Sequence, residues 1–325
     1  MRYRSIQFIG LLLLSAGIAR PAVTLLLEEP YGTFGGMNPT GHAAVYLSHV
    51  CAASATSLRR CNEGEQGVVI SRYHRISGYD WLAIPLLPYL YAVDRPDEVP
   101  SSVTPDDVAA LRDTWRRANL TEVVPDAEDG STPEGDWTQL VGSAYDRTLY
   151  AFEVETTAEQ DDQFIQTFNS RVNTNHFSLL FHNCADFARQ AIDSYYPHAV
   201  HRSLIADVGI MTPKQAARSL VSYTKRHPDL QFSVFVIRQV EGTVPRSRPV
   251  RGVLESLVKS KRYVVPLVSI AALHPVIGGS MAFAWIEGGR FDPRRMASPS
   301  ESSSEPAAIA GELESNRTGG ETPLD

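Results

Sequence analysis

The sequence predicts an α+β fold, because strand-like and helix-like segments both recur along the chain. Runs rich in β-branched and aromatic residues are typical of strands. They cover residues 25–27, 42–47, 67–73, 147–155 and 231–240, and we expect 67–73 to pair antiparallel with 42–47. A Thr or Asn cap, in two cases with proline directly after it, predicts the start of a helix. Such starts occur at Thr104, Thr157, Asn183 and Thr212.

Length and charge limit the classes of protein that this chain can belong to. Its 325 residues can bury one large core or two ordinary ones. Most of the formal charge of −7 comes from acidic residues in 298–325, so the remainder is near neutral. A nucleic-acid binder carries a basic surface, and we therefore expect no nucleic-acid partner.

The N-terminus has the organisation of an export signal. Arg2 and Arg4 precede an apolar run at 6–14, and small residues follow at Gly17 and Ala19. We interpret 1–19 as a cleaved signal peptide, with an uncleaved N-terminal anchor as the alternative. The protein is then exported, to the periplasm or the cell surface.

Export would place the three cysteines in an oxidising compartment, where disulfides form. Cys51 and Cys61 are ten residues apart with a polar, loop-like segment between them, so we expect a disulfide in an oxidising compartment. Cys184 is then left without a partner. Such a thiol is either buried and inert or reactive.

Two segments follow the globular domain, which we assign to 20–255. Residues 263–286 contain no Asp, Glu, Lys or Arg and are long enough as a helix to cross a bilayer. We predict a transmembrane helix that anchors the protein in a membrane; Pro266 and Pro275 favour the alternative, a hydrophobic hairpin packed on the domain. Residues 298–325 are rich in Ser, Glu, Gly and Pro and predict a disordered tail.

The most informative stretch is 177–192. An apolar, strand-like run at 177–181 ends at His182-Asn183, and Cys184 then opens a segment with helical spacing of its apolar residues. In the first turn of a helix, free backbone N–H groups and the helix dipole favour a thiolate. A buried core cysteine is the alternative. His42 begins a strand directly after a glycine-rich loop, where it could face such a helix; a surface histidine is the alternative there.

Two motifs together resemble a known group. Gly41-His42-Ala-Ala-Val-Tyr-Leu47 followed far downstream by Asn183-Cys184-Ala-Asp-Phe-Ala188 is similar to the circularly permuted NlpC-type papain-like enzymes, which include the lecithin:retinol acyltransferase relatives. The resemblance implies a permuted papain-like fold, in which a small antiparallel sheet packs against a helix with the nucleophilic cysteine at its N-terminus. It implies hydrolysis of amides or esters, or acyl transfer, with Cys184 as nucleophile and His42 as base.

The supporting residues of such a site are less well marked. A polar residue on the next strand would orient the histidine, and we name His74 as the candidate, with Ser71 as the alternative. The oxyanion hole would use the backbone N–H of Cys184 and a second donor from the 31–41 loop, for which we name Tyr31. Asn183 would support the helix start. We expect His182 and Asp186 to point away from the sulfur.

No other chemistry has a motif in this chain. A phosphate-binding glycine loop, paired CxxC motifs and a His-Glu-x-x-His motif are all missing from the sequence, so we expect neither cofactor nor metal. The sequence thus predicts an exported thiol hydrolase or acyltransferase acting on an envelope peptide or a lipid. The alternative is a catalytically inactive envelope binding or scaffold protein of the same fold. The sequence does not predict the oligomeric state.

Overall fold

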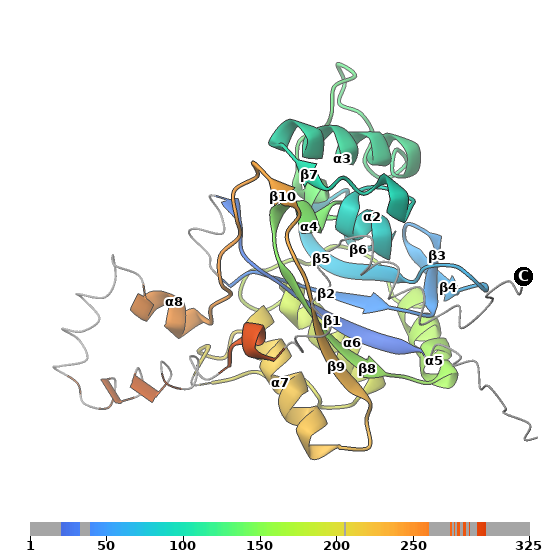
Figure 1. Cartoon of the computed structure of the whole chain (residues 1–325). Coiled ribbons are helices and arrows are strands. Elements are labelled where there is room, and N and C mark those ends of the chain that lie inside the picture. The colour runs from blue at the N-terminus through green and yellow to red at the C-terminus, as the bar shows by residue number, and fades with distance from the viewer. Residues whose placement is uncertain are drawn as a thin grey trace, which may run out of the picture.

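The computed structural model describes residues 21–32, 40–204, 206–259, 274, 276, 278–279, 282–283, 286 and 291–296. Within these ranges the fold is α+β, as predicted, with one large antiparallel sheet and helices packed on it (Figure 1). The predicted signal peptide 1–19, the tail 298–325 and most of 263–286 lie outside the described residues. Among the residues that are described, no helix is long and apolar enough to span a membrane.

The sheet has six strands in the order β6-β5-β2-β1-β8-β9. Every neighbouring pair is antiparallel, including β2 with β5, which confirms the predicted pairing. The strands are β1 Ala22–Glu28, β2 His42–Leu47, β5 Val68–Ile76, β6 Tyr79–Pro85, β8 Leu149–Glu155 and β9 Phe232–Ile237. Strands β1 and β2 therefore lie at the centre of the sheet, and His42 begins one of them.

Helices begin where the sequence predicts them. The side chains of Thr104, Thr157, Asn183 and Thr212 each accept a hydrogen bond from the first turn of the helix that follows. The helices are α2 Leu86–Tyr91, α3 Pro105–Asn119, α4 Ser143–Asp146, α5 Ala158–Asn169, α6 Cys184–Tyr195, α7 Pro213–Arg226 and α8 Val253–Lys259, with short 3-10 turns at η1 Pro96–Glu98, η2 Asp136–Gln139 and η3 Pro293–Arg295.

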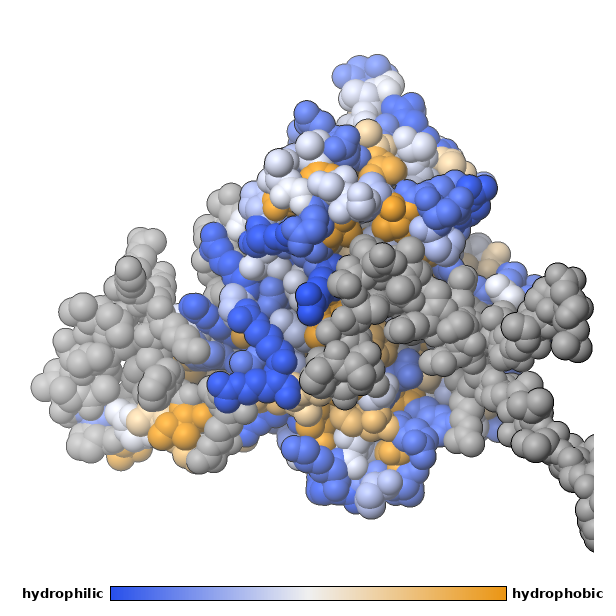
Figure 2. All heavy atoms as spheres, viewed as in Figure 1, coloured by the Kyte–Doolittle hydropathy of each residue, from blue (hydrophilic) through white to orange (hydrophobic). Residues whose placement is uncertain are grey.

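Each face of the sheet buries its own core, because side chains alternate along a strand. Ala43 and Val45 of β2 face the core shared with α5, α6 and α7, whereas Ala44 and Tyr46 face the core shared with α2, α3 and α4. The two groups of helices lie on different sides of the sheet in Figure 1. Hydrophilic side chains cover much of the described surface in Figure 2, and hydrophobic ones appear there as separate patches.

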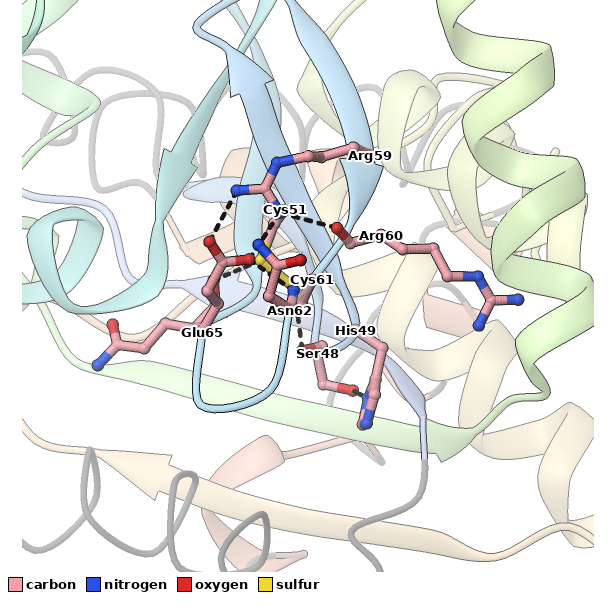
Figure 3. Close-up of a disulfide and its surroundings, with 9 residues drawn as sticks. Ser48, His49, Cys51, Arg59, Arg60, Cys61, Asn62 and Glu65 are labelled. Carbon is pink, nitrogen blue, oxygen red and sulfur yellow. Dashed lines mark hydrogen bonds and ion pairs between the residues drawn. A yellow bond between two sulfur atoms is a disulfide. The ribbon is translucent and has the colours of Figure 1, made fainter.

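A hairpin carries the disulfide of the protein. Strands β3 (Val50–Ser54) and β4 (Ser57–Arg60) pair antiparallel, and Cys51 is bonded to Cys61 just beyond β4. Figure 3 shows this disulfide beside the ion pair of Arg59 with Glu65. The disulfide was predicted, but the segment that it closes is a hairpin instead of a loop. A second small pair joins β7 (Ser102–Val103) to β10 (Glu241–Gly242) in parallel.

The run at 177–181 was predicted as a strand, and this prediction was wrong. Ser178 and His182 exchange two backbone hydrogen bonds, so the residues between them form a tight turn. Leu179, Leu180 and Phe181 are each about half exposed on this turn. Apolar residues favour a strand because they pack on a half-buried sheet, and these three side chains do not pack in that way.

Helix α8 continues past residue 255, at which we predicted the end of the domain. Helix α8 is held by a buried ion pair between Lys214 and Glu255, with 2.7 Å between Nζ and Oε2. After the following segment the chain returns at 291–296, where Phe291 is buried near Phe152. Residues 291–296 thus complete the core on the α6 side of the sheet.

Candidate active site

Asn183 fixes the start of helix α6. Its Oδ1 accepts hydrogen bonds from the N–H groups of Ala185 and Asp186, at 2.9 and 3.0 Å. Its Nδ2 donates to the carbonyl oxygens of Leu179 and Met211, at 3.1 and 3.0 Å. All hydrogen-bonding capacity of this amide is therefore used to hold the turn at 178–182 and Met211, two residues before α7, against the first turn of α6. Cys184 is the first residue of that turn.

Cys184 lies beside the strand that carries His42. Its sulfur interacts with the backbone amide of Ala43, the residue directly after His42, and with that of Ala185. The thiol is partly exposed to a pocket, and Cys184 is the free cysteine of the protein. The fold thus joins two motifs that lie more than 140 residues apart in the sequence.

The helix start favours a thiolate at Cys184, whereas the burial of this side chain acts in the opposite direction. Burial raises the pKa of this thiol to about 11, and the carboxylate of Glu28 acts in the same direction. Hydrogen bonds from the amides of Ala43 and Ala185, together with the charge of Arg147, oppose this shift and are outweighed. At neutral pH the sulfur therefore carries its proton.

His42 is oriented by Ser71. Its Nε2 lies 2.7 Å from Oγ of Ser71, which in turn donates its hydroxyl hydrogen to the carbonyl oxygen of Ala43 at 2.8 Å. Because that hydrogen is already used, Oγ must accept from Nε2–H. In the neutral ring Nδ1 is then the nitrogen that can take a proton.

The ring of His42 is buried against an aromatic neighbour. Tyr73 stacks on it, with 4.3 Å between ring centroids and 16° between the planes. Burial and the nearby charge of Arg147 hold the pKa of His42 well below its usual value of 6.5. The imidazole is therefore neutral over the whole physiological range. Among the described residues no hydrogen bond joins the His42 ring to Cys184. The two side chains line the same pocket.

A buried charge pair lies next to these residues. Glu28, which pairs with His42 across β1 and β2, forms an ion pair with Arg147 at 3.0 Å and accepts a hydrogen bond from the hydroxyl of Tyr89. Burial raises the pKa of Glu28, whereas Arg147 and Tyr89 lower it. The ring of Tyr31 covers the guanidinium of Arg147 at 4.5 Å.

These groups line one pocket of about 920 Å³. Cys184, His42 and Arg147 line it, and Tyr31 contributes from the loop before β2. The exposed turn at 178–182 supplies apolar side chains, Leu179 and Leu180, to the pocket wall. The volume is in the range of small-molecule and peptide-side-chain sites.

Other residues named from the sequence lie elsewhere in or around this pocket. His74, named ahead of Ser71 as the orienting residue, lines the pocket but is half exposed, tilted on Phe177 and 3.7 Å from the carboxylate of Asp136. Of the two candidates, Ser71 makes the hydrogen bond to His42. His182 is exposed, and Asp186 forms an ion pair with Arg202.

Sequence reasoning missed Glu28, Arg147, Tyr73 and Tyr89. The signal for Glu28 was a charged residue that directly follows the apolar run at 25–27, where a buried charge must find a partner. Nothing in the local sequence indicates that the partner is Arg147, because β1 and β8 are neighbours only in the folded sheet.

In the part of the chain that the structure describes, no group of three or more His, Cys, Asp or Glu side chains could hold a metal ion. Comparisons with family models, with curated proteins and with solved structures found no match to this chain.

Proposed function

We propose that this protein is an exported thiol hydrolase or acyltransferase with a permuted papain-like fold, acting on amide or ester bonds. The observation that carries the proposal is the position of Cys184. It opens helix α6 with its sulfur beside the amide of Ala43, the residue next to His42, and both side chains line the same pocket.

The resting site holds a neutral thiol and a neutral imidazole, so proton transfer accompanies attack. The sulfur of Cys184 forms a bond to the substrate carbonyl carbon while Nδ1 of His42 takes the thiol proton. His42 then gives that proton to the leaving amine or alcohol as the carbon–heteroatom bond breaks. The thioester that remains passes its acyl group to water or to an acceptor hydroxyl or amine.

Developing negative charge on the carbonyl oxygen needs hydrogen-bond donors. The first residue of a helix has no intrahelical partner for its N–H, and Asn183 caps the next two amides instead. The N–H of Cys184 is therefore the first oxyanion donor in this proposal. The hydroxyl of Tyr31, which also lines the pocket, is the second.

Several features support an exported, membrane-associated enzyme with an envelope peptide or a lipid as substrate. The signal-like sequence at 1–19 and the disulfide between Cys51 and Cys61 both suit an oxidising compartment. The uncharged segment 263–286 supports membrane association. The apolar turn at the pocket rim suits a substrate with an apolar group.

The test is turnover of a panel of acylated peptides, acyl esters and acyl amides by the full mature chain. Cys184→Ser should lower kcat at least about 10³-fold, and His42→Gln about 10²-fold to 10⁴-fold. Ser71→Ala should lower kcat about tenfold by freeing the ring. Ser170→Ala, at the exposed end of α5, is the matched control and should not change kcat. Turnover that survives Cys184→Ser would refute the proposal.

A second function, an inactive envelope binding protein, is favoured by one observation. The pKa of Cys184 is raised to about 11 while that of His42 is lowered, which is the reverse of an activated thiolate and imidazolium pair. A binding protein would hold members of the panel without converting them. Its affinity would also be unchanged in Cys184→Ser.

A further inference from the structure

The exposed hydrophobic side chains of this protein are concentrated in one region of the chain. Within the described residues up to 259, every large hydrophobic side chain that is exposed lies between residues 172 and 208. These side chains are Val172, Leu179, Leu180, Phe181, Leu204 and Val208. Single exposed hydrophobic residues are normal on a protein surface, whereas a group of them indicates an interaction site.

Two loops that touch each other carry most of this group. The turn at 178–182 and the loop at 202–209 present Leu179, Leu180, Phe181, Leu204 and Val208. Arg202 joins the two loops, because its guanidinium donates to the carbonyl oxygens of Phe181 and Gly209, at 3.3 and 3.2 Å. It also lies 5.9 Å from the centroid of the Phe181 ring. We call these two loops together the apolar rim.

The backbone of the apolar rim is arranged to expose these side chains. Val208 has a φ of 52°, in the left-handed region that β-branched residues rarely adopt, and its side chain is 59% exposed. Such strain is typical of sites with a function. In the other loop, Ser178 and His182 exchange two backbone hydrogen bonds. These bonds satisfy polar groups that would be costly to place in an apolar environment.

The apolar rim borders the pocket of Cys184. Leu179 and Leu180 belong to the rim and also line the pocket. Ile210 and Met211, the next two residues after the loop at 202–209, line it as well. Whatever binds the rim therefore lies beside the pocket.

The two loops and their flanks carry almost no negative charge. In 170–183 and 196–212 the single acidic residue is Asp207, which is 3% exposed and accepts a hydrogen bond from the backbone of Val253. The same two stretches contain Arg171 and Arg202. The surface of the rim is therefore apolar and weakly basic.

A strongly basic stretch of sequence also borders the pocket. Residues 243–262 contain six Lys or Arg and one acid, Glu255, which is buried in its ion pair with Lys214. Val253 of this stretch lines the pocket, and the backbone N–H of Arg248 donates to the carbonyl oxygen of the lining residue Pro30. Apolar side chains beside a group of basic residues are typical of surfaces that bind anionic lipids.

We propose that the apolar rim docks on an anionic lipid bilayer, so that the pocket of Cys184 lies at the membrane surface. The large apolar side chains enter the headgroup region, and the basic residues of 243–262 attract the anionic headgroups. The inference concerns a surface of the globular domain, so it depends neither on turnover at Cys184 nor on an anchor at 263–286.

The test measures hydrogen exchange of backbone amides in the full mature chain. The chain is compared alone, with vesicles of pure phosphatidylcholine, and with vesicles of phosphatidylcholine and phosphatidylglycerol in equal parts. With the anionic vesicles we expect amide exchange at 179–181 and 204–209 to slow at least about fivefold. Protection should be weaker with pure phosphatidylcholine, because no anionic headgroup then attracts the basic residues.

Phe181→Asp combined with Leu204→Asp is the variant that tests the rim. Both side chains are exposed, and neither lines the pocket. Ala109→Asp combined with Ala110→Asp is the matched control, since it adds the same charge at exposed positions of α3, on the other side of the sheet. Protection of both loops should be lost in the rim variant and kept in the control.

The outcomes that would overturn the inference are distinct. They are unprotected loops with anionic vesicles, equal protection by both kinds of vesicle, and protection that survives in the rim variant. Protection that appears without vesicles and rises with protein concentration would assign the rim to a second copy of the chain. The comparison of vesicles uses the wild type alone, so it stands even if the rim variant does not fold.

Discussion

At the scale of single residues, His42 links the chemistry of the site to the stability of the fold. The ring is buried and stacks on Tyr73, and its Nε2–H donates a hydrogen bond to Ser71. Burial and Arg147 lower the pKa of His42 well below 6.5, so the folded state binds the proton less readily than the unfolded state. His42 therefore stabilises the fold above about pH 6.5, and this contribution is lost as the pH falls towards its lowered pKa.

Comparison of His42→Gln with the wild type isolates the contribution of His42 to the pH dependence of the unfolding free energy. Between pH 6.5 and 5 the wild type should lose up to about 1.4 kcal/mol of unfolding free energy per pH unit more than the variant. Urea denaturation at several pH values measures both slopes. All other titrating groups are common to the two proteins and cancel. Equal slopes would show that His42 is not held neutral by the fold.

The residues of the site differ in how far the sequence could predict them. Asn183 and Cys184 were found because a helix cap is a local feature, and His42 because it begins a strand after a glycine-rich loop. Ser71 and His74 lie on the same strand, and only the fold shows which one bonds to the ring. The raised pKa of Cys184 depends on burial by distant segments, which no local pattern records.

At the scale of elements, the hairpin of β3 and β4 depends on its disulfide. The bond between Cys51 and Cys61 closes ten residues of chain and thereby restricts the unfolded state. The double variant Cys51→Ala, Cys61→Ala should lower the free energy of unfolding by about 2–3 kcal/mol. Urea denaturation provides the measurement. Dithiothreitol should destabilise the wild type by a similar amount and leave the double variant unchanged, whereas an unchanged midpoint in both would contradict this role.

Helix starts were predicted better than strands. The caps at Thr104, Thr157 and Thr212 act through side chains within three residues, so the sequence alone determines them. The apolar run at 177–181 has the composition of a strand but lies in an exposed turn, and among the described residues it pairs with no strand. Strand formation needs such a partner, and the local sequence does not contain it.

At the scale of the whole molecule, strand order was beyond prediction. Strand β8 pairs with β1 across more than 100 residues of intervening chain, and this pairing brings Arg147 to Glu28. The mixture of strands and helices was predictable from composition and periodicity, whereas the neighbours in the sheet depend on packing of the complete chain. The permuted papain-like arrangement stays a prediction.

Residues 291–296 pack on the core, so we expect a truncation that removes them to destabilise the protein. Phe291 is buried near Phe152, and Arg294 lies 3.3 Å from the carboxylate of Glu29. A chain that ends after residue 259 should lose about 3–5 kcal/mol of unfolding free energy, the usual cost of removing a buried phenylalanine. Chemical denaturation of this form, of a form that ends after 297 and of Phe291→Ala provides the measurement. Equal stability of the two truncated forms would contradict a structural role for the return.

The same return has a topological consequence. Helix α8 packs on α7 through the ion pair of Lys214 with Glu255. Phe291, two residues before η3, packs on Phe152 of β8, so the described residues on both sides of the uncharged segment belong to one domain. A single passage through a bilayer would place these residues on opposite sides of it. The described residues on both sides of the segment therefore lie in the compartment that contains Cys184.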